Sequence, residues 1–100
     1  MFGLIGKIIA LPEKRDELIA ILIEGTNDMP GCLSYIVAKD KTDKEAIWIT
    51  EVWTDSAKHR ESLSLPNVQA AIQKGKPLIV SFDTRFETEP VGVNGEYESN

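Results

Sequence analysis

The side chains best suited to chemistry gather in one segment, where a carboxylate, an indole and an imidazole follow one another at short spacing. Glu51 and Trp53 are two positions apart, and His59, the only histidine of the chain, comes six positions later. Imidazole is the side chain whose ordinary pKa best suits proton transfer near neutral pH. An indole beside it offers a flat apolar wall for an aromatic molecule. The spacing therefore predicts acid–base chemistry on an aromatic substrate, with His59 as base or hydrogen-bond partner and Trp53 as the wall.

Each of these residues also has a purely structural interpretation. A lone histidine on a helix often does no more than bond to a neighbour, and a strand indole commonly belongs to a core. Glu51 shares a strand face with Trp53, and a buried carboxylate there needs a partner. Arg85 and Lys7 are the candidate partners. We expect an ion pair for Glu51, with substrate binding as its functional alternative.

Tyr35 and Cys32 lie on a second predicted strand. Tyr35 is a candidate substrate-binding residue whose hydroxyl donates a hydrogen bond, and a surface hydroxyl is the alternative. A single cysteine forms no internal disulfide, which favours a reducing compartment. One histidine and one cysteine, 27 positions apart, do not make a zinc site, so the sequence predicts no metal.

The segment that carries Glu51 changes from a strand pattern to a helix pattern. Residues 47–54 alternate with a period of two, as expected of a strand. Thr54, Asp55 and Ser56 then supply capping oxygens for a short helix over 56–63. The same reasoning predicts strands at 2–11, 32–39 and 78–87, a helix between Pro12 and Asn27, and a second helical segment at 67–74.

The order strand, helix, strand, strand, broken helix, strand predicts an α+β chain with the ferredoxin-like split β-α-β fold. That fold has a four-stranded antiparallel sheet with helices on one face. We expect Trp48 and Val52 to pack under the helices, and Ile47 and Ile49 to lie on the opposite face. An apolar sheet face of that size is rare in a monomer, so a homodimer with its sheets face to face is expected. The predicted domain spans 1–88, and 89–100 is a tail, disordered or packed on the partner subunit.

The composition and net charge of the chain indicate which kinds of binding partner it favours. The chain has 100 residues, 42% of them hydrophobic, which fits one small globular domain. A formal net charge of −5 disfavours nucleic acid and anionic membranes as partners, because phosphate binding needs a basic surface. No apolar run reaches the length of a membrane span. We expect a cytoplasmic protein that binds a small molecule.

Three stretches together resemble the antibiotic biosynthesis monooxygenase family: Gly31–Asp40 (GCLSYIVAKD), Ile47–Leu63 (IWITEVWTDSAKHRESL) and Leu65–Ile72 (LPNVQAAI). Members typically have a Gly-Cys-x-x-Tyr strand start, a Glu-x-Trp strand end and a histidine in the next helix. The resemblance runs from about Phe2 to Phe86. It implies a dimeric α+β barrel, with a pocket between sheet and helices or inside the barrel.

The resemblance also implies a class of reaction. Characterised relatives oxidise quinols or polycyclic phenols with molecular oxygen, without metal or flavin; others degrade haem, and one type isomerises a phosphorylated sugar. The haem-degrading pattern has an asparagine on the first strand and a histidine in the second helical segment, and neither stands here at 4–7 or 68–74. We therefore expect a cofactor-independent monooxygenase for a small aromatic or quinol-like substrate. The alternatives are a non-catalytic small-molecule binding module and an isomerase of a small oxygenated metabolite.

Overall fold

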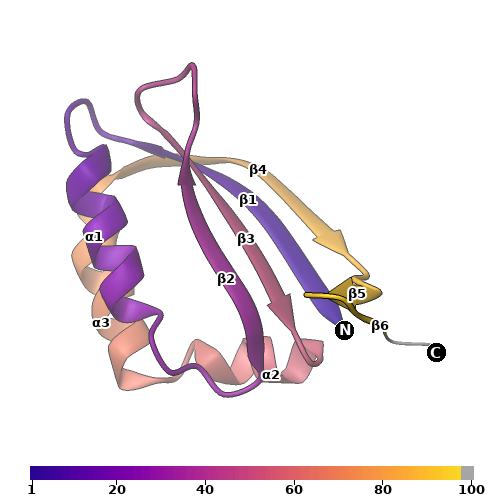
Figure 1. Cartoon of the computed structure of the whole chain (residues 1–100). Coiled ribbons are helices and arrows are strands. Elements are labelled where there is room, and N and C mark those ends of the chain that lie inside the picture. Colours follow the sequence, from indigo (N-terminus) through magenta and orange to yellow (C-terminus); the bar gives the residue numbers. More distant parts are fainter. Residues whose placement is uncertain (98–100) are drawn as a thin grey trace.

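The computed structural model (Figure 1) describes residues 1–97. In chain order its principal elements are β1 (Phe2–Ala10), α1 (Arg15–Gly25), β2 (Cys32–Lys39), β3 (Ala46–Trp53), α2 (Ser56–Ser62), α3 (Pro66–Gly75), a 3-10 turn η1 (Lys76–Leu78) and β4 (Ile79–Thr88). The predicted elements are all present, with ends that differ by a few residues.

Four strands form one antiparallel sheet in the order β2-β3-β1-β4. The two strands joined by a short hairpin, β2 and β3, are neighbours, whereas β1 and β4 pair although they are far apart in sequence. Figure 1 shows α1, α2 and α3 on the same side of this sheet. The predicted ferredoxin-like α+β fold is thus confirmed.

Local chemistry explains where the second helical region begins and breaks. The Asp55 carboxylate accepts the backbone N–H of Lys58 at 2.8 Å and caps α2. Leu65, which precedes a proline, is extended, and Pro66 occupies the first turn of α3, where a missing N–H costs nothing. The Asn67 side-chain amide then donates to the Gly25 carbonyl at 3.1 Å. This hydrogen bond joins the start of α3 to the end of α1.

The predicted assignment of the two faces of β3 was wrong. Ile47 is fully buried in one cluster with Leu18 of α1, so the face with Ile47 and Ile49 packs under the helices. Trp48 lies on the open face, where its indole N–H donates to Asp40 at 2.8 Å and the Lys7 ammonium lies 5.5 Å from the centroid of its ring. Alternation shows which residues share a face, but both faces of β3 carry large apolar side chains, so the pattern does not tell which one is covered.

The segment after β4 folds into a small hairpin. β5 (Gly92–Val93) pairs with β6 (Glu96–Tyr97) across Asn94 and Gly95, whose φ angles are 50° and 84°. Positive φ at both central residues is the conformation that an Asn-Gly hairpin turn favours. The predicted tail over 89–100 extends beyond the described residues at 98–100, and its role toward a partner subunit stays a prediction.

Candidate functional site

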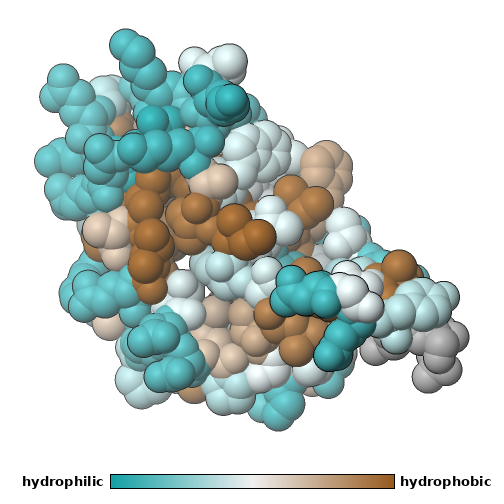
Figure 2. Space-filling model, viewed as in Figure 1, coloured by the Kyte–Doolittle hydropathy of each residue, from teal (hydrophilic) through white to brown (hydrophobic). Residues whose placement is uncertain are grey.

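A cavity of about 790 Å³ lies between part of the covered face of the sheet and the helices. A volume of that size falls within the range of small-molecule sites. Figure 2 shows a hollow in the middle of the molecule with apolar side chains around it. Its apolar lining comes from three strands and two of the helices: Leu4, Ile8, Ile49, Phe82, Leu18, Leu22, Val68 and Ala71.

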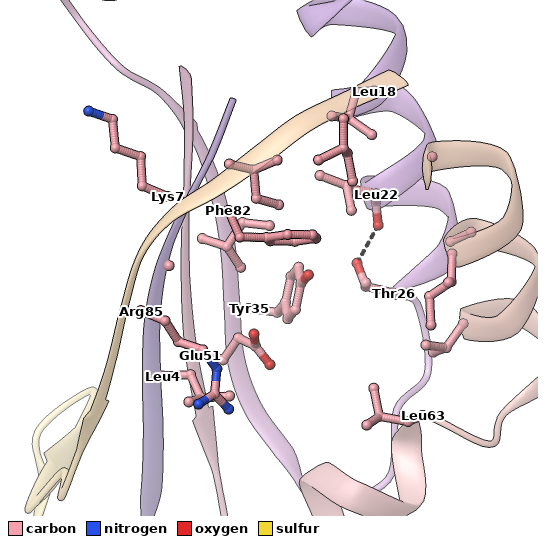
Figure 3. A pocket seen from close by; sticks show the side chains of 18 of the residues that line it. Leu4, Lys7, Leu18, Leu22, Thr26, Tyr35, Glu51, Leu63, Phe82 and Arg85 are labelled. Carbon is pink, nitrogen blue, oxygen red and sulfur yellow. Dashed lines mark hydrogen bonds between the residues drawn. The ribbon is translucent and has the colours of Figure 1, made fainter. Parts of the chain in front are cut away.

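Strand register brings two of the predicted site residues together on the sheet side of the cavity. Tyr35 of β2 lies directly opposite Glu51 of β3, and Glu51 lies opposite Leu4 of β1. Figure 3 shows the Tyr35 ring and the Glu51 carboxylate projecting from the sheet into the cavity. Gly6 of β1 lies opposite Ile49, one row closer to the β2–β3 hairpin, and lines the cavity without a side chain to fill it.

The Glu51 carboxylate is bound by an indole rather than a cation. Its Oε1 accepts the Nε1–H of Trp53 at 3.0 Å, and Trp53 is only 1% exposed. Over residues 1–97, no lysine or arginine lies within ion-pair distance of Glu51. The expected ion pair was therefore wrong: strand alternation turns Lys7 to the open face, where its Nζ lies 3.7 Å from Asp83. Arg85 does line the cavity, but its guanidinium lies 4.0 Å from Glu87.

Burial changes the pKa of both Glu51 and Tyr35, the two polar residues that lie opposite each other on β3 and β2. Burial raises the pKa of Glu51, against the opposing effects of the Trp53 hydrogen bond and of electrostatic interactions with His59 and Arg85. Burial also raises the pKa of Tyr35, and the negative charge of Glu51 raises it further. Tyr35 is therefore a neutral hydroxyl donor, and Glu51 is a carboxylate that takes up a proton more readily than one in water.

Trp53 and His59 form an aromatic wall at one end of the cavity. The ring centroid of His59, on α2, lies 5.5 Å from that of Trp53 in an edge-on arrangement with an interplanar angle of 70°. The His59 ring centroid also lies 5.5 Å from the ring centroid of Phe2. Such spacings are those of favourable aromatic pairs. All four predicted site residues thus line one cavity, and the arrangement offers an aromatic surface beside a carboxylate and a phenol.

The sequence pattern did not predict that Phe82 and Arg85 of β4 both line the cavity. Strict alternation puts residues three apart on opposite faces, yet both line the cavity, as Figure 3 shows. The pairing of β1 with β4 shifts register between Lys7 and Ile8, so that Ile8 is opposite Phe82 and Gly6 opposite Arg85. A β-bulge of this kind re-aims side chains and leaves no alternation signal in the sequence.

The described residues add two further observations on the kind of site. No group of three or more His, Cys, Asp and Glu side chains within 1–97 is arranged to hold a metal ion. Among the helices in this part of the chain, none is long and apolar enough to cross a membrane.

Comparison with known proteins identifies the family of this chain. Residues 1–74 match the family model described as antibiotic biosynthesis monooxygenase. A curated relative from Synechocystis sp., "Uncharacterized protein sll1783", is 30% identical over 77 residues, which cover 74% of this chain and 52% of that protein. The chain thus spans about half the length of this curated relative.

Solved structures agree with the family match. A crystal structure described as a "putative Antibiotic biosynthesis monooxygenase from Chloroflexus aurantiacus J-10-fl" is 59% identical, with a TM-score of 0.92, over 95% of this chain and 97% of that one. A protein of the same description from Deinococcus radiodurans is 27% identical, with a TM-score of 0.76, over 93% and 95% of the two chains. One from Caulobacter crescentus CB15, 17% identical over 91% and 90% of the two chains with a TM-score of 0.81, shares the fold.

Proposed function

Since the chain belongs to the antibiotic biosynthesis monooxygenase family, we propose that it oxidises a small aromatic or quinol-like substrate with molecular oxygen, without metal or flavin. The observation that carries the proposal is the cavity. It combines apolar walls with an aromatic end, a hydroxyl donor and two groups able to accept a proton. An electron-rich phenol fits such a lining, because its ring needs apolar contact and its hydroxyl needs polar partners.

The reaction has a simple balance. A phenol with a C–H opposite its hydroxyl, together with one molecule of oxygen, gives a quinone and water. Loss of the hydroxyl proton leaves an electron pair on the substrate oxygen, and the phenolate then reduces oxygen. One oxygen atom becomes the new carbonyl and the other leaves as water.

The cavity residues have distinct roles in this proposal. Trp53 supports the aromatic ring, and the Tyr35 hydroxyl stabilises negative charge on the substrate oxygen. His59 and Glu51 are the two groups that can accept the proton. The apolar lining excludes water and so protects reactive intermediates.

We further propose that the protein is a cytoplasmic homodimer that joins through the open face of the sheet. Ile36 and Phe86 on that face are 54% and 58% exposed, and Trp48 lies on the same face on β3, one of the two strands between theirs. Apolar side chains at such exposure favour burial against a second copy of the sheet. The acidic net charge of −5 disfavours a nucleic-acid or membrane partner.

Oxygen uptake tests the proposed activity. A panel of quinols and hydroxynaphthalenes is supplied to the wild type and to Trp53→Phe and His59→Ala. We expect uptake with some members of the panel, and a loss of roughly tenfold or more in kcat/KM for Trp53→Phe because the aromatic wall is reduced. Binding of the panel with no uptake above background would contradict the oxygenase and leave a binding module on the same scaffold.

A further inference from the structure

We propose that Glu51, rather than His59, takes the proton from the substrate, and that it thereby selects molecules with a hydroxyl group over the corresponding ethers. This inference rests on the proposed function, because it names the proton acceptor and the substrate group in the same cavity. It also has a consequence for binding that does not depend on oxygen.

The Glu51 carboxylate is positioned to accept a proton from a molecule in the cavity. Its carboxylate lies between Tyr35 on β2 and Leu4 on β1 and projects into the cavity (Figure 3). The Trp53 indole holds Oε1 at 3.0 Å and so fixes the orientation of the whole group. Within residues 1–97, no other hydrogen bond or ion pair reaches this carboxylate. Oε2 is thus an oriented acceptor with no partner from the described part of the chain.

The surroundings of His59 favour a different role for its imidazole. Its ring packs against both Phe2 and Trp53 at centroid distances of 5.5 Å, so the imidazole is part of the aromatic wall. It comes from α2, at the end of the cavity, whereas Glu51 comes from an interior strand of the sheet. We assign to His59 the support of the ring, and an electrostatic effect on Glu51.

The electrostatics agree with this division of roles. Burial raises the pKa of Glu51, which brings its affinity for protons closer to that needed near neutral pH. Trp53 on the same strand, His59 on α2 and Arg85 on β4 oppose that rise and keep the carboxylate available as a base. A buried carboxyl with such a set of neighbours is typical of functional sites.

The proton step is balanced within the cavity. The O–H bond of the substrate breaks, its electron pair stays on the substrate oxygen, and the proton forms a bond with Oε2 of Glu51. Tyr35, the cross-strand neighbour of Glu51, is a neutral hydroxyl donor for the new oxyanion. A molecule whose hydroxyl is methylated has no proton to give, and it places a methyl group against the carboxylate.

Paired ligands test this inference. Binding of 1-naphthol and of its methyl ether, 1-methoxynaphthalene, is measured by calorimetry near neutral pH with oxygen removed. For the wild type we expect naphthol to bind about tenfold more tightly, which is the usual value of one hydrogen bond to a charged acceptor. In Glu51→Gln, which keeps an acceptor for the Trp53 indole, the preference should fall to about twofold. Glu24→Gln removes the same charge from an exposed position on α1 and should keep the wild-type preference.

Several results would overturn the inference. Equal binding of the two ligands by the wild type would do so, as would no binding of either, and neither result depends on whether a variant folds. A preference kept in Glu51→Gln but lost in His59→Gln would assign the proton to His59. Because oxygen is absent, a protein that prefers naphthol but never consumes oxygen would retain this inference and lose the proposed oxygenase activity.

Discussion

The Glu51 carboxyl lies among apolar side chains, so its protonation is linked to folding. Its ordinary pKa is 4.5, and burial raises the pKa in the folded state. The folded chain therefore holds this proton more tightly than the unfolded chain does. Stability from this group is fully present below pH 4.5 and is lost as the pH rises through the raised folded pKa.

Glu51→Gln should remove the loss of folding stability that accompanies ionisation of Glu51. The amide cannot ionise, so we expect the variant to match the wild type in acid and to melt a few degrees higher above the folded pKa of Glu51. Thermal unfolding measured across the pH range, with Glu24→Gln as the exposed control, checks this expectation. A variant that is less stable than the wild type at high pH would show that the ionised carboxylate stabilises the fold.

Gly6 leaves space in the cavity that a side chain would fill. A Cβ placed there meets only the Thr84 carbonyl oxygen, at 3.7 Å, and this is an ordinary contact. We expect Gly6→Val to fold with the wild-type melting temperature or higher, because valine favours strands. Binding of 1-naphthol should weaken about tenfold, since overfilling a packed space costs about 1–3 kcal/mol. Unchanged binding would place the ligand outside this cavity.

At the residue scale, the sequence allowed us to predict which side chains line the cavity. It did not allow us to predict the hydrogen bonds between them. Tyr35, Glu51, Trp53 and His59 all line one cavity, while their roles stay predictions. The Trp53 indole as the partner of Glu51 was missed. Two residues two positions apart on a strand share a face, but whether a long side chain bends toward its neighbour depends on packing around it.

At the element scale, α1 and α3 approach closely at Gly25. The residue is buried, and a Cβ added to it would clash with the Cβ of Ala71. Gly25→Ala should therefore destabilise the chain by about 1–3 kcal/mol, despite the better helix propensity of alanine. That loss corresponds to a melting temperature lower by roughly 4–8 °C for each kcal/mol.

Thermal melts of Gly25→Ala and Gly6→Ala provide a matched pair. Both add one methyl group in place of hydrogen, but only the first meets a neighbouring side chain at clashing distance. We expect a clear loss for Gly25→Ala and little change for Gly6→Ala. Equal melting temperatures for the two variants would mean that the helices move apart at low cost.

The elements themselves were largely predictable, because their signals are local. Alternation gave β2 its observed bounds, Cys32–Lys39, and the proline at 66 marked the break between two helices. The covered face of β3 was not predictable, since both faces are apolar. The register shift that brings Phe82 and Arg85 to the cavity depends on how β4 pairs with β1, and no local pattern records that pairing.

At the scale of the whole molecule, the proposed dimer joins through the open face of the sheet. Ile36→Glu places a charge on that face, which the proposed dimer would bury at a cost of several kcal/mol. We expect the wild type to sediment as a dimer at micromolar concentration and Ile36→Glu as a monomer. Ile23→Glu changes an equally exposed apolar residue on α1, at 58% exposure, and should remain dimeric. A monomeric wild type would contradict assembly through this face.

In the proposed function, a phenol or quinol reacts with oxygen in the cavity between the sheet and the helices. Oxygen consumption by the wild type and by Gly6→Val, with the same panel of quinols and hydroxynaphthalenes, tests it most directly. We expect uptake by the wild type, with about one oxygen consumed per quinone formed, and at least about a tenfold lower rate in the cavity-filled variant. No uptake above background with any member of the panel, or equal uptake by both proteins, would contradict it.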